Sequence, residues 1–165
     1  MGPGKVNGLI AHYLEALGIT TGGVYAAAIG DWTAYTPTCS WVSNVTVTAF
    51  YRTVGKEVQV TGMVECSGAP TSAVLTITLP AGVTVATTKF PQPALGLWPC
   101  GTADIYDDPT AAMTGRTFYE ASSGKLRFGC NTVANPSFAS TVTQASPVTF
   151  GANDAVYFTA SLPIV

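Results

Sequence analysis

The chain has 165 residues and a formal net charge of -2 at pH 7. Charged residues make up 10% of the sequence, against about 25% in typical soluble domains, whereas the hydrophobic share of 47% is ordinary. This length predicts one domain with a core of its own, and the hydrophobic share argues against a disordered chain. The sparse charge indicates that part of the exterior is buried in an oligomer or a larger assembly.

The same composition excludes several partners and sites. With only 7 Lys and Arg residues, the chain has no basic surface for nucleic acid. Its apolar stretches are much shorter than the roughly 20 residues that cross a membrane, and we expect no secretion signal at its start. The cysteines Cys39, Cys66, Cys100 and Cys130 lack the paired spacing of a zinc site. We therefore predict buried free thiols and no cofactor.

Residues 1–30 predict an arm that precedes the body. Apolar residues recur at helical spacing as far as Gly18, where a helix would be capped. A helix of about three turns is unstable alone in water, so we expect its apolar face to bind a partner surface. That face consists of Val6, Leu9, Ile10, Tyr13, Leu14 and Leu17.

Residues 31–165 show the alternation of apolar and polar side chains that is typical of β-strands. The clearest case is a hairpin, in which strands over 45–52 and 58–66 flank Gly55 and Lys56. Further short strands are predicted over 73–79, 83–85, 94–98, 103–106, 116–120, 125–128, 148–150 and 155–160. Eight or more short strands at this spacing predict an all-β fold, an antiparallel jelly-roll-like β-sandwich preceded by the short helical arm.

Few residues point to chemistry. The single histidine, His12, lies on the arm, where a catalytic base would lack preorganised partners. Asp104, Asp107 and Asp108 are the densest acidic group, and carboxylates of this kind serve calcium binding or glycoside hydrolysis. Their spacing lacks the alternation of the calcium loop, and Asp-Asp-Pro is typical of a turn. We therefore expect no catalytic residue, no bound metal and no enzymatic activity.

The aromatic residues favour a binding surface. Trp and Tyr stack on sugar rings and contribute strongly to protein interfaces. We expect Trp32 and Tyr35, where the arm meets the body, to lie at an interface, with Trp98 as a further candidate. An exposed set of aromatic residues suits either glycan recognition or contact between subunits, and both readings stay open.

Three segments carry a resemblance to a known family. They are Trp-Thr-Ala-Tyr-Thr-Pro-Thr over 32–38, the hairpin over 50–62, and Ile-Thr-Leu-Pro-Ala-Gly over 77–82. In this order they resemble a head domain that recurs in virion proteins of tailed bacteriophages. Phe-Gly-Ala-Asn-Asp over 150–154, followed by a strand, is similar to the close of that domain. The resemblance covers roughly 32–165 and implies a trimeric jelly roll outside a phage particle, with no catalytic residues.

Two roles follow from this resemblance. The first is a homotrimeric capsid decoration or cement protein, made in the host cytoplasm and carried on the exterior of the virion. Its arm would bind the major capsid protein or another virion component. The second is a tail fibre or tail-tip receptor-binding head that recognises a host surface glycan. Neither role involves nucleic acid or a membrane.

Overall fold

The computed structural model describes residues 30–90, 96–132 and 135–165, with the side chains of 131–140 excepted. The helix predicted for the arm, with its apolar face from Val6 to Leu17, lies outside the described residues.

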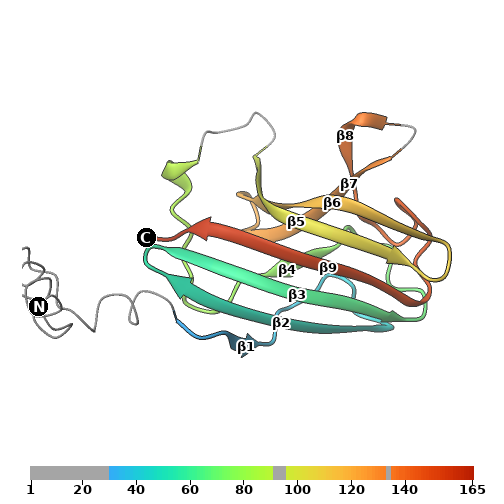
Figure 1. Cartoon of the computed structure of the whole chain (residues 1–165), viewed down its shortest axis with the longest axis horizontal. Coiled ribbons are helices and arrows are strands. Elements are labelled where there is room, and N and C mark those ends of the chain that lie inside the picture. The colour runs from blue at the N-terminus through green and yellow to red at the C-terminus, as the bar shows by residue number, and fades with distance from the viewer. Residues whose placement is uncertain (1–29, 91–95, 133–134) are drawn as a thin grey trace, which may run out of the picture.

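The described chain is all-β and antiparallel, which confirms the predicted class (Figure 1). A single 3-10 turn, η1 (Thr87–Lys89), interrupts the strands of the described part. The strands are β1 (Thr33–Tyr35), β2 (Val45–Val54), β3 (Glu57–Ser67), β4 (Thr76–Thr78), β5 (Leu97–Asp107), β6 (Ala111–Glu120), β7 (Lys125–Thr132), β8 (Asn135–Thr141) and β9 (Ala152–Pro163).

All these strands belong to one sheet, in the order β1-β2-β3-β9-β5-β6-β7-β4, and β8 also pairs with β7. The two ends of this path meet, because the chain that follows β1 pairs with β4. The Thr78 amide donates to the Thr38 carbonyl at 3.1 Å, and the Ser40 amide donates to the Thr76 carbonyl at 3.0 Å. The sheet therefore closes on itself, which covers strand edges that would otherwise be free to pair.

A hydrophobic core fills the inside of the curled sheet. Two strands separate β7 from β9 in the sheet, yet the rings of Phe128 and Phe158 lie 5.2 Å apart, centroid to centroid. This contact crosses the interior. Along β3, Val58, Val60 and Val64 are fully buried, since every second side chain of a strand points to the same face.

The predicted hairpin is confirmed. β2 and β3 pair continuously from Val45 with Cys66 to Val54 with Glu57, which leaves Gly55 and Lys56 as the loop. Gly55 has a φ of 58°, and a type II′ hairpin turn places glycine at this first loop position.

Several other strand predictions were wrong in extent. The strands predicted over 94–98 and 103–106 belong, in their described parts, to one longer strand, β5. Residues 148–150 follow Pro147 and form no strand; the Phe150 amide donates to the Gln144 carbonyl at 2.9 Å, and its ring packs against Trp41. In the segment 83–85, Val85 makes only an isolated bridge to Ile164. Strands β1 and β8 were not predicted.

Candidate functional site

The solvent-facing side of β2, β3, β9 and β5, with Trp32 beside it, collects most of the exposed hydrophobic side chains; we call it the outer face. Six large hydrophobic residues are exposed among those described, and four belong to this face. These four are Trp32 (44% exposed), Phe50 (38%), Tyr106 (45%) and Tyr157 (49%). Scattered exposed hydrophobic residues are ordinary, but a gathering on one face marks a binding surface.

The strand register shows how the middle of this face is built. Phe50 lies opposite Thr61, and Thr61 lies opposite Thr159 on β9. In the next row, Met63 lies opposite Tyr157. We call Thr48, Phe50, Thr61, Met63, Tyr157 and Thr159 the central patch; none of the six is charged, and Arg52, Glu65, Asp104 and Arg116 lie around it. An uncharged centre with a charged rim is typical of protein interfaces.

One end of the outer face is hollowed into a groove. β5 carries a bulge between Pro99 and Gly101, and its paired register with β9 ends where Ala103 lies opposite Phe158. A bulge bends the strand that carries it. Near the bulge, the Thr102 amide donates to the Thr159 hydroxyl at 3.3 Å. The groove lies next to this contact and is lined by residues 100–101 of β5 and 159–161 of β9.

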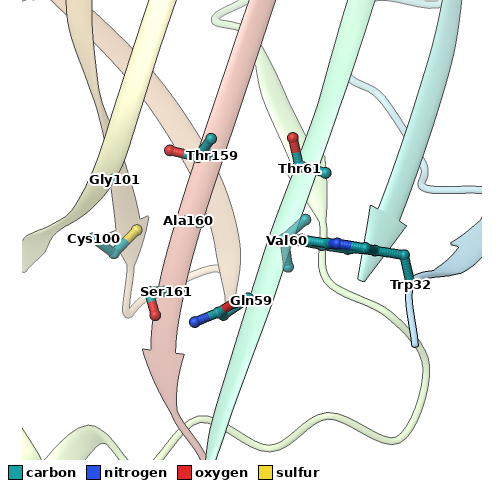
Figure 2. Close-up of a pocket in the computed structure, with 9 residues that line it drawn as sticks. All are labelled: Trp32, Gln59, Val60, Thr61, Cys100, Gly101, Thr159, Ala160 and Ser161. Atoms are coloured by element: carbon teal, nitrogen blue, oxygen red, sulfur yellow. The ribbon is translucent and has the colours of Figure 1, made fainter. Parts of the chain in front are cut away.

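The groove encloses about 470 Å³ and is lined by uncharged residues, as Figure 2 shows. The lining comes from Trp32 and from three strands: Gln59, Val60 and Thr61 of β3, Cys100 and Gly101 of β5, and Thr159, Ala160 and Ser161 of β9. Gly101 is required here, since a Cβ at this position would lie 1.9 Å from the Thr159 carbonyl oxygen.

A chain of contacts fixes the polar side of the groove. The Arg52 guanidinium carbon lies 4.7 Å from the centroid of the Trp32 ring, and Arg52 Nε donates to Gln59 Oε1 at 2.9 Å. Because the Gln59 side-chain oxygen accepts from Arg52, the amide nitrogen of Gln59 points toward Ser161 on β9 (Figure 2). The groove therefore places an amide donor beside the hydroxyl of Ser161, its register partner on β9.

The cysteine of the groove is held in its thiol form by burial. Burial raises the pKa of the Cys100 thiol to about 12, and Cys100 Sγ donates to the Thr117 carbonyl at 3.5 Å. The thiolate is the reactive form, and at neutral pH this pKa keeps the group protonated. All four cysteines are free, as predicted; Cys66 and Cys130 are buried, and Cys39 and Cys100 are half-buried.

The structure separates the aromatic residues that the sequence singled out. Trp32 is exposed on the outer face, whereas Tyr35 is half-buried, with its hydroxyl 3.3 Å from the Thr78 carbonyl. Trp98 is only 4% exposed and stacks between Phe90 and Tyr119, so it belongs to the core. His12 and the apolar face of the arm lie outside the described residues.

The acidic group is divided between a strand and a turn. Asp104 lies on β5, and the Thr110 amide donates to the Asp107 carbonyl at 2.7 Å, which closes the turn into β6. In the described part of the chain, no three His, Cys, Asp or Glu side chains gather as metal ligands would. Asp154, which sequence reasoning did not weigh as a site residue, is 2% exposed and accepts from the amides of Asp108 and Gly151.

The groove was also missed. Its Thr, Gln and Ser residues follow the alternation of polar side chains along β3 and β9, which marks the outward face of each strand. Nothing in that alternation shows where the paired register of β5 with β9 ends. The Pro99-Cys100-Gly101 sequence was the available signal, because Pro cannot donate to a ladder and Gly often marks a bulge.

Comparison with known proteins does not place the chain in a family. No protein-family model, no curated protein and no solved structure matches it. Over the described ranges, the structure has no helix with the length and apolar character that a membrane crossing requires.

Proposed function

We propose that this chain is a non-enzymatic structural protein of a phage virion, a homotrimer that decorates the outside of the capsid. The observation that carries the proposal is the central patch. A surface that buries Phe50, Met63 and Tyr157 gains hydrophobic stabilisation, and it removes no ion from water. The sister copies of this chain are the partners that we assign to the patch.

The phage setting is supported by the sequence motifs over 32–38, 50–62 and 77–82, which resemble virion head domains. We also infer that the curled sheet is a jelly-roll-like sandwich preceded by a helical arm. In its support, β4 to β7 have the Greek-key order 5-6-7-4, and Phe128 meets Phe158 across the interior. The absence of enzymatic activity is supported by Asp107 in a turn and by the protonated Cys100.

The oligomer is tested by the mass of the full chain in solution, measured by light scattering or sedimentation. We expect three times the chain mass for the wild type. Tyr157→Asp places a charge in the central patch and should give monomers that keep the β-sheet circular dichroism spectrum. The control is Val42→Asp, because Val42 is 79% exposed but lies outside the outer face. A monomeric wild type, or a trimer that survives Tyr157→Asp, would contradict the proposal.

The location is tested by the number of copies in purified particles, measured by quantitative mass spectrometry against the major coat protein. A number comparable to the coat protein supports decoration. The arm is tested by Leu9→Asp together with Leu14→Asp, which should leave the body folded and weaken attachment to capsids, since a charge opposes burial of an apolar face. Unchanged occupancy of the variant on capsids would exclude the arm as the anchor.

The groove favours a second candidate, a tail fibre or tail-tip head that recognises a host surface glycan. A Trp ring beside hydroxyl and amide groups is suited to sugars. In this case the copy number is a small fraction of the coat protein. Labelled protein should then bind susceptible cells, and host polysaccharide should compete. A protein that does not bind those cells is not a receptor-binding head.

A further inference from the structure

We infer that the groove between β5 and β9 binds a neutral saccharide, with Trp32 as the stacking surface and Gln59, Thr159 and Ser161 as the polar contacts. This inference deepens the receptor-binding candidate and rests on it. It specifies the site on the outer face and the charge class of the ligand.

The shape of the groove is set by backbone and small side chains. The floor consists of Gly101, which lies against the β9 backbone at Thr159, and of Ala160, and Trp32 forms one wall. At about 470 Å³ the groove lies within the size range of small-molecule sites, which is roughly 300–1,000 Å³. A floor without bulky side chains lets a flat ligand approach the sheet.

The lining selects against charge. Gln59, Thr61, Thr159 and Ser161 supply hydroxyl and amide groups, and the lining contains no Asp, Glu, Lys or Arg. Burying an ionised ligand here would leave its charge unpaired, which is costly, whereas each sugar hydroxyl both donates and accepts hydrogen bonds as these side chains do. Arg52, a cation beside the lining, lies over the Trp32 ring and donates through Nε to Gln59 Oε1.

Trp32 is held ready for stacking. Arg52 lies against the indole and is itself fixed by Gln59, so the ring is oriented before a ligand arrives. Trp32 is 44% exposed as a residue, and its indole offers apolar area to the C–H face of a pyranose. Preorganisation of this kind reduces the entropy lost on binding.

The tryptophans supply a direct test. The chain has 3 Trp residues. Trp41 and Trp98 are 1% and 4% exposed, so quenching of fluorescence by acrylamide reports mainly Trp32. The full-length protein is titrated with neutral malto-, manno- and galacto-oligosaccharides and, in parallel, with oligogalacturonate as the anionic probe. We expect at least one neutral probe to protect Trp32 from quenching, and oligogalacturonate not to do so.

Affinity for the protecting probe is then measured by calorimetry in three variants. Trp32→Ala and Gln59→Ala should each weaken binding at least tenfold. Thr46 lies on β2 and is exposed but outside the groove, so Thr46→Ala should bind as the wild type does. No protection by any neutral probe, preference for oligogalacturonate, or affinity unchanged in Trp32→Ala would overturn the inference.

Binding to host cells separates a failure of the groove from a failure of the receptor role. If Trp32→Ala still binds susceptible cells as the wild type does, the receptor role stands and the groove is not its site. If the wild type itself does not bind those cells, the receptor-binding candidate fails, and the saccharide inference fails with it.

Discussion

The hydroxyl of Tyr35 donates to the carbonyl of Thr78 at 3.3 Å and so joins β1 to β4, the strands at the two ends of the sheet path. The Tyr35 ring also packs edge-on against Tyr51 of β2, at 5.7 Å between centroids. One side chain therefore contacts both sides of the closure. Its burial raises the pKa of Tyr35 from 10.0 to about 12.

The raised pKa of Tyr35 predicts a loss of stability in alkali. A group whose pKa is higher in the folded state stabilises the fold below its unfolded pKa, and that contribution disappears as the pH rises through the folded value. The free energy of unfolding should therefore fall between pH 10 and about 12. Tyr35→Phe should make this fall shallower, as measured by urea unfolding at each pH.

In the Tyr35→Phe variant, part of the fall in unfolding free energy with pH should remain. Burial also raises the pKa of Cys66 to about 11 and that of Cys100 to about 12, so these thiols lose stability over the same pH range. Tyr106→Phe is the control, since its ring is exposed on the outer face. An identical pH profile for Tyr35→Phe and the wild type would show that Tyr35 is not buried in this way.

Gly62 faces the core from β3 and lets Phe158 pack closely against that strand. A Cβ at this position would lie 2.6 Å from Phe158 Cζ and 2.6 Å from the Thr48 carbonyl oxygen. Gly62→Ala should therefore lower the free energy of unfolding by about 1–3 kcal/mol, in the range of overpacked cores, measured by chemical denaturation. In the control, Gly151→Ala, the nearest atom would be 3.9 Å away. Equal stability of the two variants would contradict this packing.

Asp154 ties the β5–β6 turn to the start of β9. Its carboxylate accepts from the Asp108 amide at 2.8 Å and from the Gly151 amide at 2.6 Å. Asp154→Ala leaves these donors without their acceptor and should cost about 1–3 kcal/mol in thermal or urea unfolding. The exposed Asp104 is the control, and Asp104→Ala should change stability by no more than about 0.5 kcal/mol. A similar loss of unfolding free energy in both variants would contradict a stabilising role for the hydrogen bonds of Asp154.

The lowered pKa of Glu120 predicts a loss of stability in acid. The Ser123 hydroxyl at 2.6 Å lowers the pKa of Glu120 below 4.5; burial opposes this shift, and Arg127 at 2.8 Å adds to it. A lowered pKa stabilises the fold above the unfolded value, and the contribution disappears as the pH falls through the folded value. Glu120→Gln should therefore lose less stability than the wild type as the pH drops below 4.5, as measured by urea unfolding at each pH. A steeper acid loss in Glu120→Gln would contradict this linkage.

The all-β class and the central hairpin were predictable because they depend on local patterns. Alternation from Val45 to Cys66 gave the two strands, and Gly55 gave the turn between them. The extents of the other strands were less predictable, since pairing partners decide them. Residues 33–35 form a strand because β2 lies beside them, and no alternating pattern of their own marks them.

The candidate site depends on relationships that a linear sequence does not display. Trp32 was singled out because Trp is common at binding surfaces, and the structure places it on an exposed face. Gln59 and Ser161 were not, because only the register of β3 with β9 brings them together. The groove further requires the bulge at Gly101, whose effect on β5 and β9 follows from tertiary pairing.

The place of β9 in the sheet has a consequence for biosynthesis. β9 is the last of the described strands to leave the ribosome, and it lies between β3 and β5. The β1–β3 and β5–β7 meanders can form early from local contacts, but each exposes an unpaired edge until residues 152–163 emerge. Completion of the body therefore waits for β9, and a chain that stops before β9 would carry two half-sheets with exposed edges that can pair with other chains.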